Sequence, residues 1–222
     1  MTRVLVLRPE PGASATVGRA RARGLDAIAF PLFEIAPVEW RAPDASRFDA
    51  LLLTSANAVR FGGEQLGVLR RLPVHAVGVA TAEAARQAGF DVASTGEMGV
   101  DGLLGSIDPS FQLLHLAGSD RKTPQQPRQK ITSITVYCSK PRNDVDLTAA
   151  RDSVAMVHSP RAAGRFAELI GVNKSFVSIA AISRDAADAA GFGWAAVEAA
   201  DAPTDEALLA LTERLCNKVQ AR

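Results

Sequence analysis

The sequence predicts an α/β protein made of two similar domains, each a parallel β-sheet flanked by helices. Short apolar runs alternate with Ala-rich amphipathic stretches along the whole chain, the pattern expected when parallel strands are joined by crossover helices. Some runs, such as residues 51–53, are continuously apolar, which suits strands that are covered on both faces. A strand–turn–helix pattern also occurs twice, which indicates a duplicated domain.

The predicted strands are short β-prone runs, and the predicted helices are Ala- or Leu-rich stretches of helical periodicity. The strands cover residues 3–7, 27–30, 50–54, 75–77, 112–116, 134–137, 154–158, 177–182 and 195–197. The helices cover residues 13–23, 56–70, 81–88, 100–106, 160–170, 184–190 and 204–219. Gly24, Gly89 and Gly191 follow Ala-rich helices where a left-handed C-cap is wanted. The leucines of the last helix share one face, which we expect to pack in the core.

The duplication also sets the domain boundaries. Its two halves are offset by roughly 102 to 105 residues, and the paired segments are residues 48–61 with 152–166 and residues 76–90 with 181–192. The N-terminal β-α-β segment is too small to be a domain alone. We expect it to complete the C-terminal half, with its first strand beside residues 154–158. The predicted domains are residues 1–34 plus 141–222 and residues 39–133, joined by linker strands at 31–38 and 131–140.

The charge balance argues against large anionic partners. The chain has 25 Lys and Arg against 24 Asp and Glu, so no net field would attract nucleic acid or an acidic membrane. No apolar run approaches the roughly 18 to 20 residues needed to cross a bilayer, and the first residues do not resemble a signal peptide. We expect a cytoplasmic monomer that binds a small molecule.

No metal or cofactor site is predicted. The sequence lacks a Gly-rich phosphate loop, a dinucleotide-binding motif, a nucleophile elbow and a zinc-protease motif. Cys138 and Cys216 have no metal-type spacing, and we expect two reduced thiols rather than a disulfide. His75, His115 and His158 lie in or after apolar runs, where hydrogen-bonded strand histidines are the ordinary expectation.

Small polar residues and glycines stand at the carboxyl ends of the predicted strands. They are Arg8, Thr54, Ser55, Gly78, Thr81, Gly118, Ser119, His158, Ser159 and Ser183. Ligands of open α/β sheets bind at this edge, and the backbone N–H groups at helix starts can receive carboxylates or phosphates. The same residue types are preferred N-caps. Ligand binding and simple capping therefore both remain open for each hydroxyl.

Basic residues and one tyrosine are further candidates. An arginine that follows a strand suits bidentate binding of a carboxylate. The alternative is an ordinary solvated surface charge. Besides Arg8, the basic residues near strand ends or the linker are Arg121, Lys122, Arg142, Arg161 and Arg184. Tyr137, the only tyrosine, lies in the returning linker. Its phenol could assist a leaving hydroxyl, or its ring could simply pack there.

The order and spacing of several segments resemble the uroporphyrinogen-III synthase family. The matching segments are residues 4–10, 30–32, 53–59, 76–78 with 81–82, 134–137, 159–160 and 203–209. This resemblance implies two flavodoxin-like domains joined by a two-stranded linker, with the active site in the interdomain cleft. It also implies an enzyme of the hydro-lyase class that needs no cofactor. Such an enzyme cyclises hydroxymethylbilane, inverts the terminal pyrrole ring and releases water to give uroporphyrinogen III in heme biosynthesis.

The resemblance also implies roles for individual residues. Tyr137 corresponds to a tyrosine that assists departure of the hydroxyl, and Thr81 to a threonine at the cleft. The residues that line the tetrapyrrole site are then Arg8, Thr54, Ser55, Asn57, Gly78 and Ser159, to which the strand-end argument adds Gly118, Ser119 and Ser183. Two segments depart from the family pattern: residues 183–185 replace a Gly-x-Thr, and residues 120–130 are too polar for the usual helix.

Two other functions remain open from the sequence. One is a two-lobed homologue that binds a polycarboxylate or tetrapyrrole without turning it over, because fold alone does not determine function. The other is a receiver-like or nucleotide-binding α/β pair, which would need an acidic cluster or glycine loop that the sequence lacks.

Overall fold

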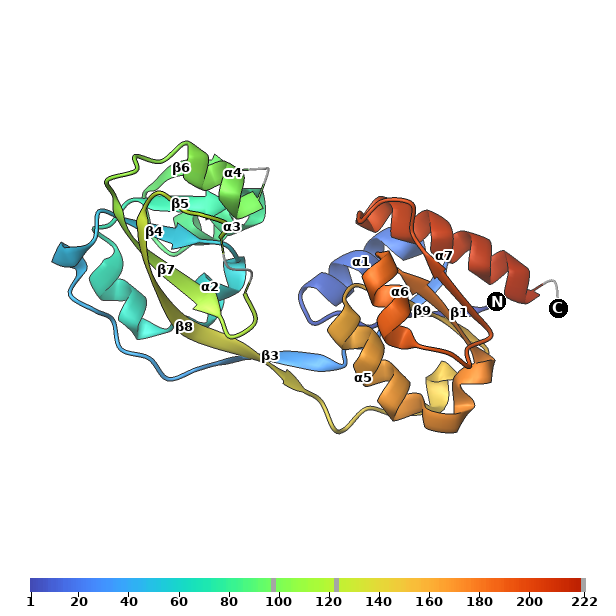
Figure 1. Cartoon of the computed structure of the whole chain (residues 1–222). Helices are drawn as coiled ribbons and strands as arrows, with labels where there is room; N and C mark the ends of the chain where they lie inside the picture. The colour runs from blue at the N-terminus through green and yellow to red at the C-terminus, as the bar shows by residue number, and fades with distance from the viewer. Residues whose placement is uncertain (97–98, 122–123, 221–222) are drawn as a thin grey trace. The chain divides into compact units, whose positions relative to one another are not determined.

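Two separate β-sheets organise the computed structural model, which describes residues 1–96, 99–121 and 124–220. The chain divides into unit 1, Met1–Glu34 with Pro141–Arg222, and unit 2, Ile35–Lys140 (Figure 1). It passes from one unit to the other twice, in β3 (Phe33–Pro37) and in β8 (Lys130–Pro141). These two strands are neighbours in one sheet.

The sheet of unit 1 has five parallel strands in the order β11-β10-β9-β1-β2. They are β1 (Arg3–Val6), β2 (Asp26–Ala29), β9 (Ser153–Val157), β10 (Val177–Ala181) and β11 (Ala196–Ala199). Numbered along this unit, the strands lie in the order 2-1-3-4-5, which is the flavodoxin-like arrangement. Strand β1 pairs with β9, so the N-terminal β-α-β segment lies in the same sheet as the strands of the C-terminal half.

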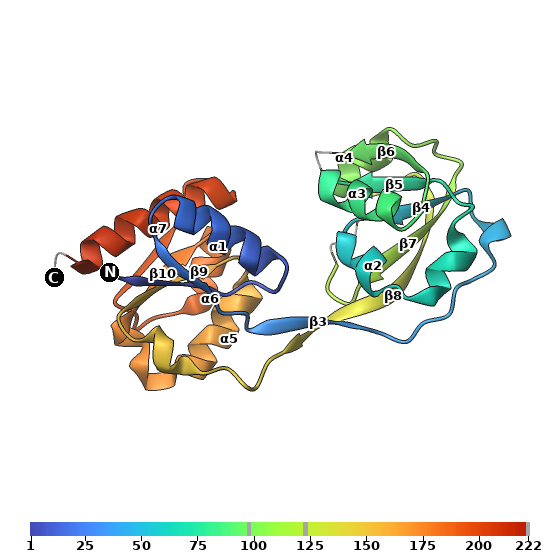
Figure 2. The same cartoon turned by 180° about the vertical axis from the view of Figure 1, so that it is seen from behind.

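Helices cover both faces of this sheet. Helices α1 (Gly12–Ala22) and α7 (Asp205–Gln220) lie on one face, and α5 (Pro160–Ile170) and α6 (Arg184–Ala190) on the other (Figures 1 and 2). The short helix η3 (Leu147–Ala150) precedes β9, and η4 (Gly171–Phe176) follows α5. The leucine face of α7 is buried, as predicted, and consists of Leu208, Leu209, Leu211 and Leu215. Among the described residues, no helix combines the length and hydrophobicity of a membrane span.

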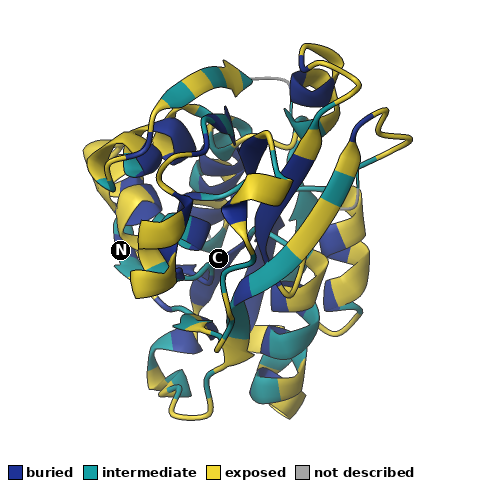
Figure 3. Cartoon of the chain, turned by 90° about the vertical axis from the view of Figure 1, so that its left-hand side faces the viewer, coloured by how far each residue is buried: buried dark blue, intermediate teal, exposed yellow. Residues whose placement is uncertain are grey.

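The sheet of unit 2 has the order β3-β8-β7-β4-β5-β6. Its other strands are β4 (Ala50–Leu53), β5 (Val74–Val77), β6 (Val92–Gly96) and β7 (Gln112–Gly118). One face is covered by α2 (Ala56–Phe61), η2 (Glu64–Leu69) and α3 (Val79–Gln87), and the other by α4 (Gly99–Gly105). The short helix η1 (Ala45–Arg47) precedes β4. In Figure 3 the helices show buried residues on one side and exposed residues on the other, as amphipathic crossover helices should.

Five strands of each sheet have the same spatial order, but the chain begins on a different strand in each unit. Strands β8-β7-β4-β5-β6 of unit 2 occupy the places of β2-β1-β9-β10-β11 in unit 1. The sequence repeat has the same correspondence, because it aligns the β4–α2 segment with the β9–α5 segment. Unit 2 is therefore a circular permutation of unit 1 that begins on the third strand of the shared arrangement.

Two predicted elements need correction. The single helix expected over residues 56–70 is wrong, because α2 ends at Phe61 and η2 begins at Glu64. Gly63 has a positive φ of 64°, a conformation that no helix contains. Strand β6 was not predicted, and the strand expected at 134–137 is longer at both ends. The glycine C-caps are confirmed, since Gly24, Gly89 and Gly191 all have positive φ.

Candidate functional site

Most of the predicted site residues flank one position in each sheet, the switch point between the first and third strands of the shared order. In unit 1 this point lies between β1 and β9, whose following helices α1 and α5 cover opposite faces of the sheet. In unit 2 it lies between β7 and β4. Such a divergence opens a crevice at the carboxyl ends of the strands, where α/β proteins bind ligands.

An ionic cluster holds the unit 1 switch point. Asp205, the first residue of α7, accepts hydrogen bonds from Arg8 Nη1 at 3.3 Å, His158 Nε2 at 3.1 Å, Arg19 Nε at 2.9 Å and Thr16 Oγ1 at 3.2 Å. These five residues form the Asp205 cluster. It joins the ends of β1 and β9 to the middle and last turn of α1 and to the start of α7, so Arg8 is an ion-paired residue and not a free surface charge.

The protonation states follow from this geometry. Burial lowers the pKa of His158, and the positive charge of Arg8 lowers it further, against the opposing effect of Asp205. Burial raises the pKa of Asp205, but the hydrogen bond and charge of Arg19 bring it below its usual value. Asp205 is then an acceptor only, so a neutral His158 donates from Nε2. The cluster carries a net charge of one positive unit, from two guanidiniums and one carboxylate.

Three predicted serines are helix N-caps. Ser55 Oγ accepts the Asn57 N–H at 3.2 Å, Ser159 Oγ accepts the Ala162 N–H at 3.2 Å, and Ser183 Oγ accepts the Ala186 N–H at 3.3 Å. Each serine lies two residues beyond the end of a strand, which is β4 for Ser55, β9 for Ser159 and β10 for Ser183. Capping thus accounts for one lone pair of each hydroxyl, while the O–H remains able to donate to a ligand.

An uncharged chain of hydrogen bonds centred on the buried His115 holds the unit 2 switch point. His115 on β7 lies 3.1 Å from Thr54 Oγ1 through Nε2 and 3.3 Å from Ser133 Oγ through Nδ1. Thr54, His115 and Ser133 form the His115 network. Burial lowers the pKa of His115 to about 4, with Arg121 contributing, so the imidazole is neutral at neutral pH. One ring nitrogen therefore donates and the other accepts, which fixes the Thr54 hydroxyl at the end of β4.

Tyr137 lies against Gly118 beside this network. A Cβ added to Gly118 would approach Tyr137 Cε2 to 2.6 Å and the phenol oxygen to 3.0 Å, so the ring occupies the space that a side chain would need. The register of β7 and β8 shifts at this point and places Gly118 opposite Tyr137. The Ser119 N–H donates to the Tyr137 carbonyl at 3.0 Å. Thr54, Gly118, Ser119 and Tyr137 are thereby brought together from three adjacent strands.

The start of α3 differs from the other predicted anion receptors. Gly78 is its N-cap, with a φ of 81°, and no side chain caps the helix. Its carbonyl accepts the N–H groups of Thr81 and Ala82 at 3.1 and 3.2 Å. Thr81 itself is buried in the first turn. The earlier N–H groups of this turn, at the positive end of a helix of nine residues, have no side-chain acceptor and suit an anion.

The remaining predicted residues are tied to their own surroundings. Asn57 accepts a hydrogen bond from Arg60 at 3.3 Å, and Arg142 pairs with Asp144 at 2.7 Å. Arg161 stacks over the Phe33 ring at 4.3 Å. Arg121 donates to the Gly118 carbonyl and to Thr135 Oγ1, both at 3.2 Å, which places it at the unit 2 site. Lys122 lies outside the described residues.

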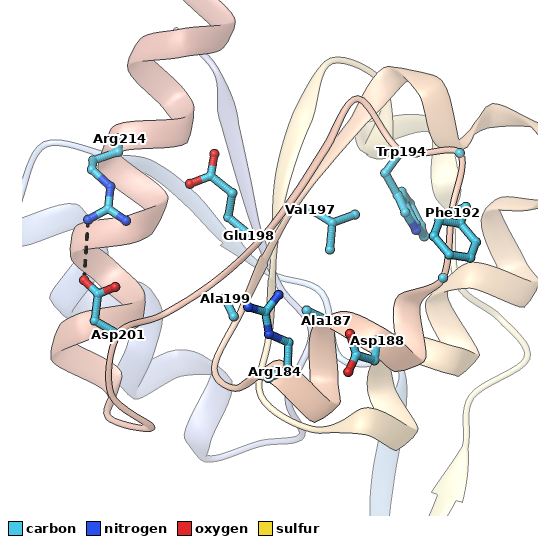
Figure 4. Close-up of a pocket in the computed structure, with 12 residues that line it drawn as sticks. Arg184, Ala187, Asp188, Phe192, Trp194, Val197, Glu198, Ala199, Asp201 and Arg214 are labelled. Carbon is cyan, nitrogen blue, oxygen red and sulfur yellow. Dashed lines mark ion pairs between the residues drawn. The ribbon is translucent and has the colours of Figure 1, made fainter.

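A separate hollow in unit 1 lies between α6 and the edge strand β11. Its volume is about 820 Å³. In Figure 4, Phe192 and Trp194 lie at one end, Arg214 and its ion-pair partner Asp201 lie at the other, and Arg184 and Glu198 lie between them. Arg184, one of the further basic candidates from the sequence, lines this hollow. None of the residues that the sequence analysis assigned to the tetrapyrrole site lines it.

Sequence reasoning missed Asp205, Thr16 and Arg19, and it assigned no role to His115. Asp205 reads as an acidic residue in the first turn of a helix, which the helix dipole explains on its own. The expectation that the histidines are hydrogen-bonded is confirmed, since His75 Nδ1 also lies 2.7 Å from Ser94 Oγ. Cys138 and Cys216 are free thiols, as expected.

Comparisons with known proteins agree with this architecture. A uroporphyrinogen-III synthase from Chlorobaculum parvum is 28% identical over 210 residues, which cover 82% of this chain and 85% of that protein. The crystal structure of uroporphyrinogen-III synthetase from Helicobacter pylori matches with a TM-score of 0.68 at 18% identity, over 97% of this chain and 100% of that one; this likeness concerns the fold. The model of the family described as uroporphyrinogen-III synthase HemD matches residues 14–210. The chain therefore belongs to the uroporphyrinogen-III synthase HemD family.

Proposed function

We propose that this protein is a uroporphyrinogen-III synthase that converts hydroxymethylbilane to uroporphyrinogen III and water, as a cytoplasmic monomer without a cofactor. Family membership supports the activity. The observation that carries the site assignment is the placement of the predicted residues. Thr54, Gly118 and Ser119 flank the switch point of one sheet, and Arg8 and Ser159 flank that of the other.

The substrate explains why such a site suits the reaction. Hydroxymethylbilane carries acetate and propionate carboxylates around its rim, so a binding surface needs many anion receptors. In unit 1 these are Arg8 and the Ser159 hydroxyl. In unit 2 they are the open N-terminus of α3 at Gly78 and the hydroxyls near Thr54. Positioning of a flexible chain is the main catalytic contribution in this proposal.

Tyr137 is the proposed auxiliary acid. The hydroxymethyl C–O bond breaks, and the departing oxygen takes a proton to leave as water. The phenol oxygen of Tyr137 lies over Gly118 and can donate a hydrogen bond to that oxygen. The resulting azafulvene is attacked by the terminal pyrrole ring to give a spiro intermediate. Fragmentation and reclosure invert that ring, and a proton is lost from a pyrrole carbon when the macrocycle closes. Thr81, in the first turn of α3, is the second proposed catalytic residue.

The proposed function is tested by incubating the pure protein with freshly generated hydroxymethylbilane, oxidising the products and resolving the isomers. We expect the type III isomer. Formation of the type I isomer alone, at the spontaneous rate, would refute the proposal. Binding of the tetrapyrrole without isomer conversion would instead support the non-catalytic homologue.

The role of Tyr137 is tested by Tyr137→Phe. The variant keeps the ring that packs on Gly118 and removes only the hydroxyl, so the fold should be unchanged. We expect kcat to fall by roughly tenfold without being abolished, because the acid assists a step that also proceeds unaided. Thermal unfolding of the variant is the control. An unchanged kcat in a correctly folded variant would remove the assigned role.

A further inference from the structure

Arg8 is restrained on three sides. Its Nη1 donates to Asp205 Oδ1 at 3.3 Å and to Thr16 Oγ1 at 3.4 Å. On another side, the guanidinium lies against Gly12, where an added Cβ would approach Nε to 2.5 Å and Cζ to 2.9 Å. A long, flexible side chain directly after β1 is thus held in one orientation at the unit 1 switch point.

The contacts leave part of the guanidinium for a ligand. Nη1 is the atom that binds Asp205 and Thr16, and no hydrogen bond from Nη2 is found among the described residues, so Nη2 can receive a carboxylate. The side chain of Arg8 is 36% exposed, whereas that of Asp205 is 23% exposed. Arg8 is therefore accessible at the carboxyl edge of the sheet, while its anchor lies deeper.

Asp205 has its other oxygen occupied. Oδ2 accepts from Arg19 Nε at 2.9 Å and from Thr16 Oγ1 at 3.2 Å, and Oδ1 also accepts from His158 Nε2. The side chain of His158 is 8% exposed, and it supports the carboxylate from the core side. Donors from β9 and α1 thus fix the carboxylate at the start of α7, so that it forms a rigid support for Arg8.

We propose that Asp205 is a positioning residue that holds Arg8 in the orientation that receives a substrate carboxylate. The inference rests on the proposed function, because it takes Arg8 as a substrate-binding residue. Asp205 acts through Arg8 and need not touch the substrate. Its removal frees Arg8 to sample many rotamers, and binding must then order it again.

The test is a double-mutant cycle on steady-state kinetics with hydroxymethylbilane. Asp205→Asn keeps the shape of the side chain and removes its charge. We expect it to raise KM on the order of tenfold with little change in kcat, the size expected for a hydrogen bond to a charged group. Arg8→Ala should raise KM by at least as much. The double variant should equal Arg8→Ala, because Asp205 has nothing left to position.

Matched variants separate positioning from a general effect. Glu206→Gln removes the same charge from the next residue of α7, where Glu206 pairs with Arg23 instead, and should leave KM unchanged. Gly12→Ala places a methyl group against the guanidinium without altering Asp205. It should raise KM as well, and it serves as the test if Asp205→Asn fails to fold.

Two outcomes would overturn the inference. One is an unchanged KM in both Asp205→Asn and Gly12→Ala. The other is a double variant whose fold increase in KM equals the product of the increases in Asp205→Asn and Arg8→Ala. Failure of the proposed function is distinct, because it would appear in the wild-type protein as an absence of the type III isomer.

Discussion

The two units share one sheet arrangement but hold their switch-point residues by opposite means. In unit 1 the Asp205 cluster is built on one carboxylate and two guanidiniums, and it joins side chains from two strand ends and two helices. In unit 2 the His115 network joins neutral side chains from three adjacent strands. Thr54 and His158 occupy equivalent positions of the repeat, yet Thr54 bonds to a strand histidine and His158 to a helix carboxylate. Equivalent strand-end positions of the two units are therefore held in place by interactions that have diverged.

One cause of the divergence is the connection between the first two strands of the shared order. In unit 1 this connection is α1, which contributes Thr16 and Arg19 to the Asp205 cluster. In unit 2 it runs from β7 to β8, and no helix is assigned in its described residues. Gln129 nevertheless fastens this segment to α4, donating to the carbonyls of Leu104 and Ile107 at 2.9 and 2.7 Å. The described residues of this connection offer no helix, and the network is built from strand residues instead.

The largest expected effect comes from the close contact between Gly118 and Tyr137 in unit 2. Gly118→Ala forces a methyl group into the Tyr137 ring. Displacement of the phenol should lower kcat by up to roughly 100-fold, and the strain should lower the free energy of unfolding by about 1 to 3 kcal/mol. Kinetics and urea unfolding measure the two effects.

The matched control for this variant is Gly164→Ala in α5, where an added Cβ meets nothing within 4 Å. It should leave kcat unchanged and stabilise the protein slightly, because Ala favours helices over Gly. If Gly118→Ala retained full activity, the rigid packing ascribed to unit 2 would be disproved.

The neutral network should respond to acid. The pKa of His115 is about 4 in the folded protein and 6.5 in its unperturbed state. As the pH falls from 6.5 to 4, the unfolded chain binds a proton that the folded protein excludes, so stability falls over that interval. The loss should be on the order of 1 to 3 kcal/mol. In His115→Gln, the free energy of unfolding should fall less steeply between pH 6.5 and 4.

Each unit can be followed separately in that experiment, since Trp40 belongs to unit 2 and Trp194 to unit 1. The fluorescence of Trp40 in a Trp194→Phe background reports on unit 2 alone. This choice excludes His158, whose pKa is also lowered and which belongs to unit 1. If the free energy of unfolding depended on pH equally with His115 and with His115→Gln, the His115 network would not cause the pH dependence.

The ionic cluster should contribute least to stability. Asp205→Asn should lower the free energy of unfolding by about 1 kcal/mol or less, because its partners Arg8 and Arg19 are partly exposed and screened. About 1 M salt should shrink this difference. The decrease caused by Thr54→Val, which leaves a ring nitrogen of His115 unpaired, should persist in salt. Equal salt dependence of the two variants would contradict the contrast between the units.

Much of the fold could be predicted from the sequence, because strand and helix periodicities are local and the repeat fixes their grouping. The pairing of β1 with β9 followed from the size of the N-terminal segment alone. Strand β6 was missed because Val92–Gly96 is a half-exposed edge strand with a polar composition. The break after α2 was missed because the apolar pattern continues through Gly62 and Gly63 into η2.

The site could be predicted only in part. Strand ends identify Thr54, Ser55 and Ser159, since the carboxyl edge follows from topology. The partners that fix these residues do not follow, because Thr16 and Asp205 are far apart in sequence and meet only through the packing of α1 against α7. The contact of Tyr137 with Gly118 also depends on a register shift in β8 that no local pattern encodes.

The permuted order of strands has a consequence for how the chain acquires its structure during synthesis. Unit 2 is one continuous stretch, so it can fold as soon as it leaves the ribosome. Strands β1 and β2 emerge first, yet their neighbour β9 is translated only after all of unit 2. Strand β1 can pair with β2 at once, but its other edge must wait for β9, and this interval is where a chaperone would have most to protect.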